Sequence, residues 1–138
     1  MNEDFTAAAA RHWNDAGILF SAGRFDNAAY LAGYVVECSL KSLIKSAGLA
    51  PKPFSHAVKT LAGDVLLLAC IAAPSIRRYC LPTSAQLDHL AKNWNPEMRY
   101  WPTGQVAKVL AEDWITAAGE AYRALVIERV LDGWSDLS

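Results

Sequence analysis

The stretch from Gly23 to Gly48 restricts the fold more than any other part of the chain, because it reads as one long helix with a marked start and a marked end. Asp26 is placed to cap the start, where its carboxylate can accept hydrogen bonds from free amides at the positive end of the helix dipole. Gly48 suits the left-handed turn that closes a helix, and Pro51 cannot continue one. The sequence therefore predicts one helix across this stretch, and the other segments read as helices that pack against it.

Two kinds of stripe run along this helix. Apolar residues recur at spacings of three and four and predict a packed face: Ala28, Leu31, Ala32, Val35, Cys38, Leu43 and Ala47. A second line carries hydroxyls, a carboxylate and an ammonium at the same helical spacing: Tyr30, Tyr34, Glu37 and Lys41. Glu37 and Lys41 allow two interpretations. They form a surface pair that contributes about 0.3 to 0.5 kcal/mol, or Glu37 lies at a groove or dimer interface, where it could orient an arginine or a ribose hydroxyl.

The run from Gly23 to Ile44 resembles the second helix of the HEPN domains, small all-helical proteins of bacterial toxin-antitoxin, phage-defence and RNA-processing systems. The residues that carry this resemblance are Asp26-Asn27, Tyr30, Gly33-Tyr34, Glu37 and Leu40-Lys41. The resemblance implies that polar residues of this helix lie near a functional groove. It also implies a homodimer and a nucleotidyltransferase-type protein partner.

Helical periodicity predicts three other long helices and one short helix. The long ones run from about Thr6 to Ala22, from Ser55 to Ala72 and from a cap at Thr103 to Leu131, and the short one runs from Ser84 to Trp94. Gly119 is expected to bend the last helix. Because the link at Gly23 is so short, the first two helices should lie antiparallel. The predicted fold is a single all-α domain over residues 1–138, an up-and-down four-helix bundle with an additional short helix.

Composition agrees with one globular domain and limits the partners. The chain has 138 residues, of which 53% are hydrophobic, and no uncharged run approaches the length of a membrane span. The acidic start is unlike a secretory signal, so a cytoplasmic location is expected. Cys38, Cys70 and Cys80 are expected to be small core residues in a reducing compartment. With 13 basic and 14 acidic side chains, any contact with RNA has to be local.

The loop between Asn93 and Gly104 is unusually aromatic and carries one arginine. Arg99 lies between tryptophan and tyrosine residues, so it could stack on a ring, pair with Glu37 or present its fork to a phosphate. The pair of Arg99 and Tyr100, followed by Pro102, also resembles the loop before the last helix of many HEPN sequences. Packing of this loop against the bundle is the competing interpretation.

The histidines do not have the spacing that describes HEPN ribonucleases, an arginine followed by a histidine after four to six residues. His12, His56 and His89 lack an arginine at that distance upstream, and Arg99 has no histidine at that distance downstream. We therefore assign no catalytic residue. The histidines are also too scattered for a metal site, and no cofactor is expected.

These observations favour a non-catalytic HEPN-like module that binds RNA, a nucleotide or a protein partner in a toxin-antitoxin or defence context. The predicted binding residues line one polar groove: Asn27, Tyr34, Glu37, Lys41, Arg99 and Tyr100. Two alternatives stay open. One is a metal-independent ribonuclease that uses Arg99 with His56 or His89. The other is a structural dimerisation domain in which the polar stripe is simply the solvated face of the helix.

Overall fold

The structure, a computed structural model, describes residues 3–49 and 58–134, and every regular element in these two ranges is helical. The predicted all-α fold is therefore confirmed. In chain order the elements are α1 (Phe5–Ser21), α2 (Phe25–Ser46), α3 (Val58–Thr60), a π-helical turn (Leu61–Val65), α4 (Leu66–Ala72), a 3-10 turn (Pro74–Arg78), α5 (Ala85–Asn93), a second 3-10 turn (Pro96–Tyr100), α6 (Lys108–Tyr122), a second π-helical turn (Arg123–Ile127) and α7 (Glu128–Leu131).

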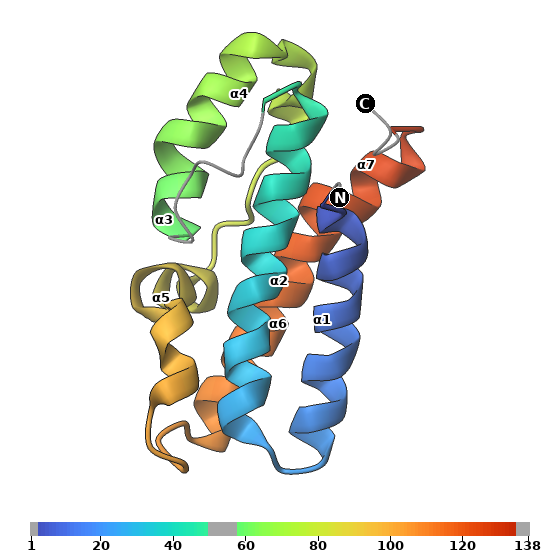
Figure 1. Cartoon of the computed structure of the whole chain (residues 1–138). Coiled ribbons are helices and arrows are strands. Elements are labelled where there is room, and N and C mark those ends of the chain that lie inside the picture. The colour runs from blue at the N-terminus through green and yellow to red at the C-terminus, as the bar shows by residue number, and fades with distance from the viewer. Residues whose placement is uncertain (1–2, 50–57, 135–138) are drawn as a thin grey trace.

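Helix α2 lies at the centre of the molecule, as the sequence predicted. Figure 1 shows α1 along one side of it, α6 behind it, and α3 with α4 along its C-terminal half. Every residue from Val35 to Ile44 is buried. A helix that is covered on all sides has to be surrounded by the others, and this burial explains why α2 contacts most elements of the fold.

Helices α1 and α2 are antiparallel, and the turn at Gly23 sets their register. Gly23 has a φ of +77°, a conformation that favours glycine. Phe5 and Lys41 lie equally far from this turn along the chain, and the Lys41 ammonium is 5.7 Å from the centre of the Phe5 ring. His12 and Tyr34 are also equally far from it, and their ring centres are 5.8 Å apart. Each of these two contacts therefore joins residues that lie equally far from Gly23 along the chain.

The last long helix begins later than the sequence predicted. Thr103 does not cap it, because α6 begins at Lys108 and has no side-chain cap. Gly119 serves close packing, since a Cβ atom there would lie 2.6 Å from the Trp13 ring of α1. The predicted end at Leu131 is confirmed.

The π-helical turn between α6 and α7 precedes a fully buried arginine. Arg129 donates from Nε to the carbonyl of Leu125 at 3.0 Å, and another nitrogen of its guanidinium donates to the Ser42 hydroxyl. Thr6 and Ser42 hydroxyls lie 2.6 Å apart. These polar contacts join α1, α2 and α7 inside the bundle.

The other predicted boundaries hold to within about a turn where the structure describes them. The short helix α5 is capped by Ser84, whose hydroxyl accepts from the amide of Leu87 at 3.0 Å. The third predicted helix ends at Ala72 as expected, although the π-helical turn interrupts it. Its predicted cap, Ser55, lies outside the described residues.

Trp94 attaches the segment after α5 to the middle of α2. Its indole lies directly over Gly33, where a Cβ atom would be 2.1 Å from the ring. The indole nitrogen donates to the carbonyl of Tyr30 at 2.9 Å, and the ring meets the edge of Tyr34 at a centre distance of 4.9 Å. This contact positions the loop that follows Trp94 along the N-terminal half of α2.

We predict that Gly33→Ala destabilises the protein by about 1 to 3 kcal/mol, because the added methyl group would overlap the Trp94 indole. Thermal or urea unfolding measures this loss. Gly17→Ala is the matched control, since a Cβ atom at that helical glycine meets no atom within 4 Å. The control should be neutral or stabilise by up to about 1 kcal/mol. Equal stability of the two variants would contradict the packing of Trp94 on Gly33.

Candidate functional site

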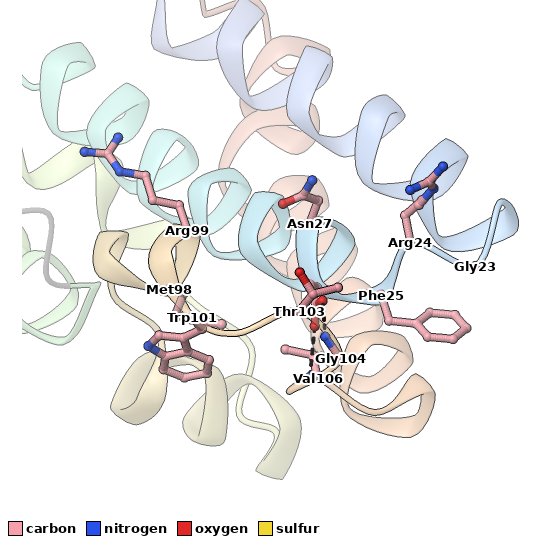
Figure 2. A pocket seen from close by; sticks show the side chains of 11 residues that line it. Gly23, Arg24, Phe25, Asn27, Met98, Arg99, Trp101, Thr103, Gly104 and Val106 are labelled. Carbon is pink, nitrogen blue, oxygen red and sulfur yellow. Dashed lines mark hydrogen bonds between the residues drawn. The ribbon is translucent and has the colours of Figure 1, made fainter.

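A pocket of about 410 Å³ lies between the start of α2 and the segment that precedes α6. We call it the arginine pocket, and its lining residues are Gly23, Arg24, Phe25, Asp26, Asn27, Met98, Arg99, Trp101, Thr103, Gly104 and Val106. Figure 2 shows Asn27 between Arg99 and Arg24. Asn27 and Arg99 are two of the predicted binding residues, and the fold brings them to one cavity from distant parts of the chain.

Asp26 holds this pocket together instead of capping α2. One carboxylate oxygen accepts from the amide of Gly104 at 2.7 Å, and the other accepts from the amide of Val106 at 3.0 Å (Figure 2). Gly104 has a φ of +91°, so the loop turns there in a conformation that suits glycine. The prediction of an N-cap at Asp26 is therefore wrong.

The displacement of the cap has a local cause. The amide of Arg24 donates to the carbonyl of Leu19 at 2.8 Å, so the reversal between α1 and α2 is complete at that residue. Helix α2 then begins at Phe25, and Asp26 falls within its first turn. The hydrogen bonds from Gly104 and Val106 to Asp26 also explain why Thr103 caps no helix, because they hold the loop that follows Thr103 against α2.

Two arginines give the pocket its chemistry. In the part of the chain that the structure describes, neither Arg24 nor Arg99 forms an ion pair with a carboxylate. Arg99 lies over the ring of Tyr100 at 4.9 Å, and the neighbouring Tyr100 and Tyr30 raise the pKa of its guanidinium. Both side chains are exposed at the pocket and fully charged at neutral pH.

A line of tyrosines leads away from Arg99 along α2. The hydroxyl of Tyr30 donates to the hydroxyl of Tyr34 at 3.1 Å. Burial is the largest cause of the raised pKa of Tyr34. The charge of Glu37 raises that pKa further, whereas the charge of Arg99 lowers it. Arg99 and Glu37 therefore both act on the Tyr34 hydroxyl.

Sequence reasoning missed His12 as a neighbour of this line. The His12 ring packs on Tyr34, and burial, followed by the charge of Arg11, lowers the pKa of His12. The predicted antiparallel arrangement of the first two helices could have revealed this contact, because His12 and Tyr34 lie equally far from the turn at Gly23. Arg24, Trp101 and Thr103 were also missed, because nothing in the local sequence shows that the loop closes on the start of α2.

Glu37 and Lys41 form a buried ion pair. The Lys41 ammonium lies 3.6 Å from a Glu37 carboxylate oxygen, and their side chains are 7% and 4% exposed. The interpretation as a surface pair is wrong, and the stripe is not a solvated face at these two residues, because α1 covers this part of α2. The two charges lie in the interior of the bundle.

Of the two histidines that the ribonuclease alternative invoked, His89 does not line the arginine pocket. The Nδ1 atom of His89 accepts from the indole nitrogen of Trp114 at 3.0 Å, which directs this ring toward α6. His56 lies outside the described residues. Within residues 3–49 and 58–134, no group of three or more His, Cys, Asp or Glu residues could hold a metal ion.

Comparison with known proteins gives one match. The family model of the HEPN domain matches residues 3–129. No curated protein and no solved structure matches the chain. A search of the described helices finds none that could span a bilayer.

We predict that Lys41→Met lowers the free energy of unfolding by about 1 to 3 kcal/mol, because it removes the ammonium that lies 3.6 Å from the buried Glu37 carboxylate. Lys92→Met is the matched control. Lys92 and Asp88 have the same spacing, but their side chains are 59% and 63% exposed. The control should lose less than about 0.5 kcal/mol in urea unfolding. Equal losses in both variants would mean that the Glu37 pair is solvated.

The three cysteines should differ in reactivity, since Cys38 is buried, Cys70 is half-buried and Cys80 is exposed. The expectation that all three are core residues is thus wrong for Cys80. Burial raises the pKa of Cys38 to about 12, so its thiol stays protonated near neutral pH. A thiol reagent should label Cys80 first and Cys38 only after unfolding, as mass spectrometry of the digested protein would show. Fast labelling of Cys38 in the folded Cys80→Ser variant would contradict this order.

Proposed function

The chain belongs to the HEPN family, and from this premise we propose that it is a non-catalytic HEPN module that binds RNA or a nucleotide through the arginine pocket. The observation that carries the proposal is the pair of Arg24 and Arg99, which line one cavity without a carboxylate partner among the described residues. The chain has a formal net charge of −1, so this local pair supplies the attraction that the whole protein lacks.

The pocket has the size and the groups that suit such a ligand. Its volume of about 410 Å³ lies within the range of small-molecule sites. Guanidinium groups bind phosphate oxygens through two parallel hydrogen bonds. Trp101 is 44% exposed at the same cavity, and an exposed indole can stack on a base. Asn27 and Thr103 add neutral groups that can bond a sugar or base edge.

The remaining predicted residues support the pocket from behind. Tyr34 connects to Arg99 through Tyr30, while Glu37 and Lys41 stabilise the part of α2 that continues from it. Tyr100 positions the Arg99 guanidinium by lying under it. In this proposal the six residues form one system, in which only Asn27 and Arg99 reach the ligand directly.

Other parts of the proposal rest on the family alone. HEPN domains often form dimers, and we propose a homodimer that acts in the cytoplasm within a toxin-antitoxin or defence system. A nucleotidyltransferase-type protein is the proposed partner. The arginine pocket takes the ligand, so the partner would bind elsewhere on the surface.

One observation favours a second function, a metal-independent ribonuclease. His12 contacts Tyr34, whose hydroxyl lies in the electrostatic field of Arg99. The lowered pKa of His12 favours its neutral form at pH 7, which a general base requires. The missing arginine-histidine spacing weighs against this alternative.

We predict that the purified protein binds single-stranded RNA and does not cleave it in the presence of a chelator. Arg99→Ala should weaken binding by about tenfold, because it removes charge-assisted hydrogen bonds to a phosphate. Arg77→Ala is the matched control, since Arg77 is also an exposed arginine and lies in the 3-10 turn Pro74–Arg78. It should change affinity less than about twofold. Fluorescence anisotropy and gel electrophoresis of the same samples measure both properties.

Two results would overturn the proposal. Cleavage that His12→Ala abolishes would assign the ribonuclease function. Absence of binding to any RNA or nucleotide would leave the protein partner as the ligand of this module.

A further inference from the structure

The loop between the 3-10 turn Pro96–Tyr100 and α6 forms one wall of the arginine pocket. Four of its residues line the cavity: Trp101, Thr103, Gly104 and Val106. Between residues 101 and 107 only Val106 is buried. The amide of Gln105 donates to the carbonyl of Pro102 at 3.3 Å, which makes a turn within the loop but does not attach that turn to α2. The place of this wall therefore depends on Val106 and on hydrogen bonds from outside the loop.

Asp26 supplies two such hydrogen bonds from the first turn of α2. One carboxylate oxygen accepts from the amide of Gly104 at 2.7 Å, and the other accepts from the amide of Val106 at 3.0 Å (Figure 2). The bonds join residues that are 78 and 80 positions apart in the chain. Hydrogen bonds to a charged acceptor are stronger than those between neutral groups. A single side chain on one wall of the pocket thus holds two amides of the other wall.

Gly104 gives the loop the shape that allows both bonds. Its φ of +91° lies in a region that side chains rarely adopt. A Cβ atom at this position would meet no atom within 4 Å, so a side chain here would strain the backbone without a clash. The attachment can therefore be weakened from either wall, by removing the carboxylate on α2 or by changing the backbone of the loop.

We infer that Asp26 is the positioning residue of the arginine pocket, which holds the wall that carries Trp101 and Thr103 in place and does not itself bond the ligand. This inference rests on the proposed function and adds the residue on which the geometry of that site depends. Both oxygens of Asp26 already accept from amides of the loop. A ligand that contacts both walls binds only when the loop is in place, so a loop that is in place part of the time lowers the affinity in proportion.

The first measurement needs no ligand, because amide hydrogen exchange followed by NMR reports on Gly104 and Val106 separately. Asp26→Ala should speed exchange at both amides by about tenfold or more, since each loses its acceptor. Asp26→Asn keeps one acceptor oxygen, so it should speed exchange at one of the two amides more than at the other. Asp15→Asn is the matched control, because it changes an exposed carboxylate of α1. It should leave both exchange rates unchanged.

The second measurement is binding of a short single-stranded RNA, by fluorescence anisotropy, with AMP as a competitor. Asp26→Ala should weaken binding by about tenfold. The direction is informative, because an Asp26 that acted only as a negative charge at the pocket would repel a phosphate, and its removal would tighten binding. Asp15→Asn should keep the affinity within about twofold. Circular dichroism of each variant checks that the helices are intact.

A change on the loop tests the same attachment without touching the carboxylate. Gly104→Ala should also speed exchange at Val106 and weaken RNA binding, because alanine disfavours the positive φ at this position. The double variant with Asp26→Ala should bind no more weakly than the weaker-binding single variant, since both changes release the same loop. Gly17→Ala, at a helical glycine where a Cβ atom meets nothing within 4 Å, is the control and should bind normally.

The failure of this inference differs from the failure of the proposed function. Unchanged exchange at Gly104 and Val106 in Asp26→Ala would show that other contacts hold the loop. Faster exchange with unchanged or tighter RNA binding would show that the loop does not position the pocket. Either result overturns the inference while the proposed function stands. If the wild-type protein binds no RNA and no nucleotide, both are overturned.

Discussion

The packing of α1 against α2 about the turn at Gly23 is the contact on which the rest of the structure depends. Once that turn is made, each residue of α1 has a defined neighbour on α2, as Thr6 with Ser42 shows. The pairing with α1 covers one side of α2. The other sides of α2 are then left for α6 and for the segment from α3 to α5 to cover. The arginine pocket forms where this arrangement ends, at the first turn of α2. A different register of the hairpin would leave the later loop without its place on α2.

A central helix with no exposed side in its second half must bury its polar residues, and here they find partners. Glu37 is paired with Lys41, and Ser42 lies between Thr6 and Arg129. Buried pairs of this kind add little to stability when compared with apolar side chains of the same volume, but an unpaired charge is strongly destabilising. We infer that these contacts select one packing of α1, α2 and α7 among several that an apolar interior would allow. In the C-terminal half of α2, the polar stripe thus selects how the helices pack. In the N-terminal half, the stripe leads to the arginine pocket.

Hydrophobic periodicity was enough to predict the helices, because burial of one face determines where each helix lies. The errors concern polar side chains that could form hydrogen bonds either within a nearby helix or with a distant part of the chain. Asp26 and Thr103 were both assigned to cap a nearby helix, yet Asp26 binds the loop after Thr103, and the two residues are distant in sequence. The four-residue spacing of Glu37 and Lys41 also could not show whether the pair is exposed or buried. The contacts of His12 with Tyr34 and of Phe5 with Lys41 could have been inferred from the sequence, by counting equal distances from Gly23.

The contact of Trp94 with Gly33 has a consequence for how this chain can diverge. The indole occupies the space that any larger side chain on α2 would need, and its hydrogen bond to the backbone of Tyr30 depends on that close approach. Neither residue can therefore be replaced freely while the other remains. Among homologues, positions 33 and 94 should change together, so that the two sites, sixty-one residues apart in the chain, carry a single inherited constraint on the orientation of the loop that follows Trp94.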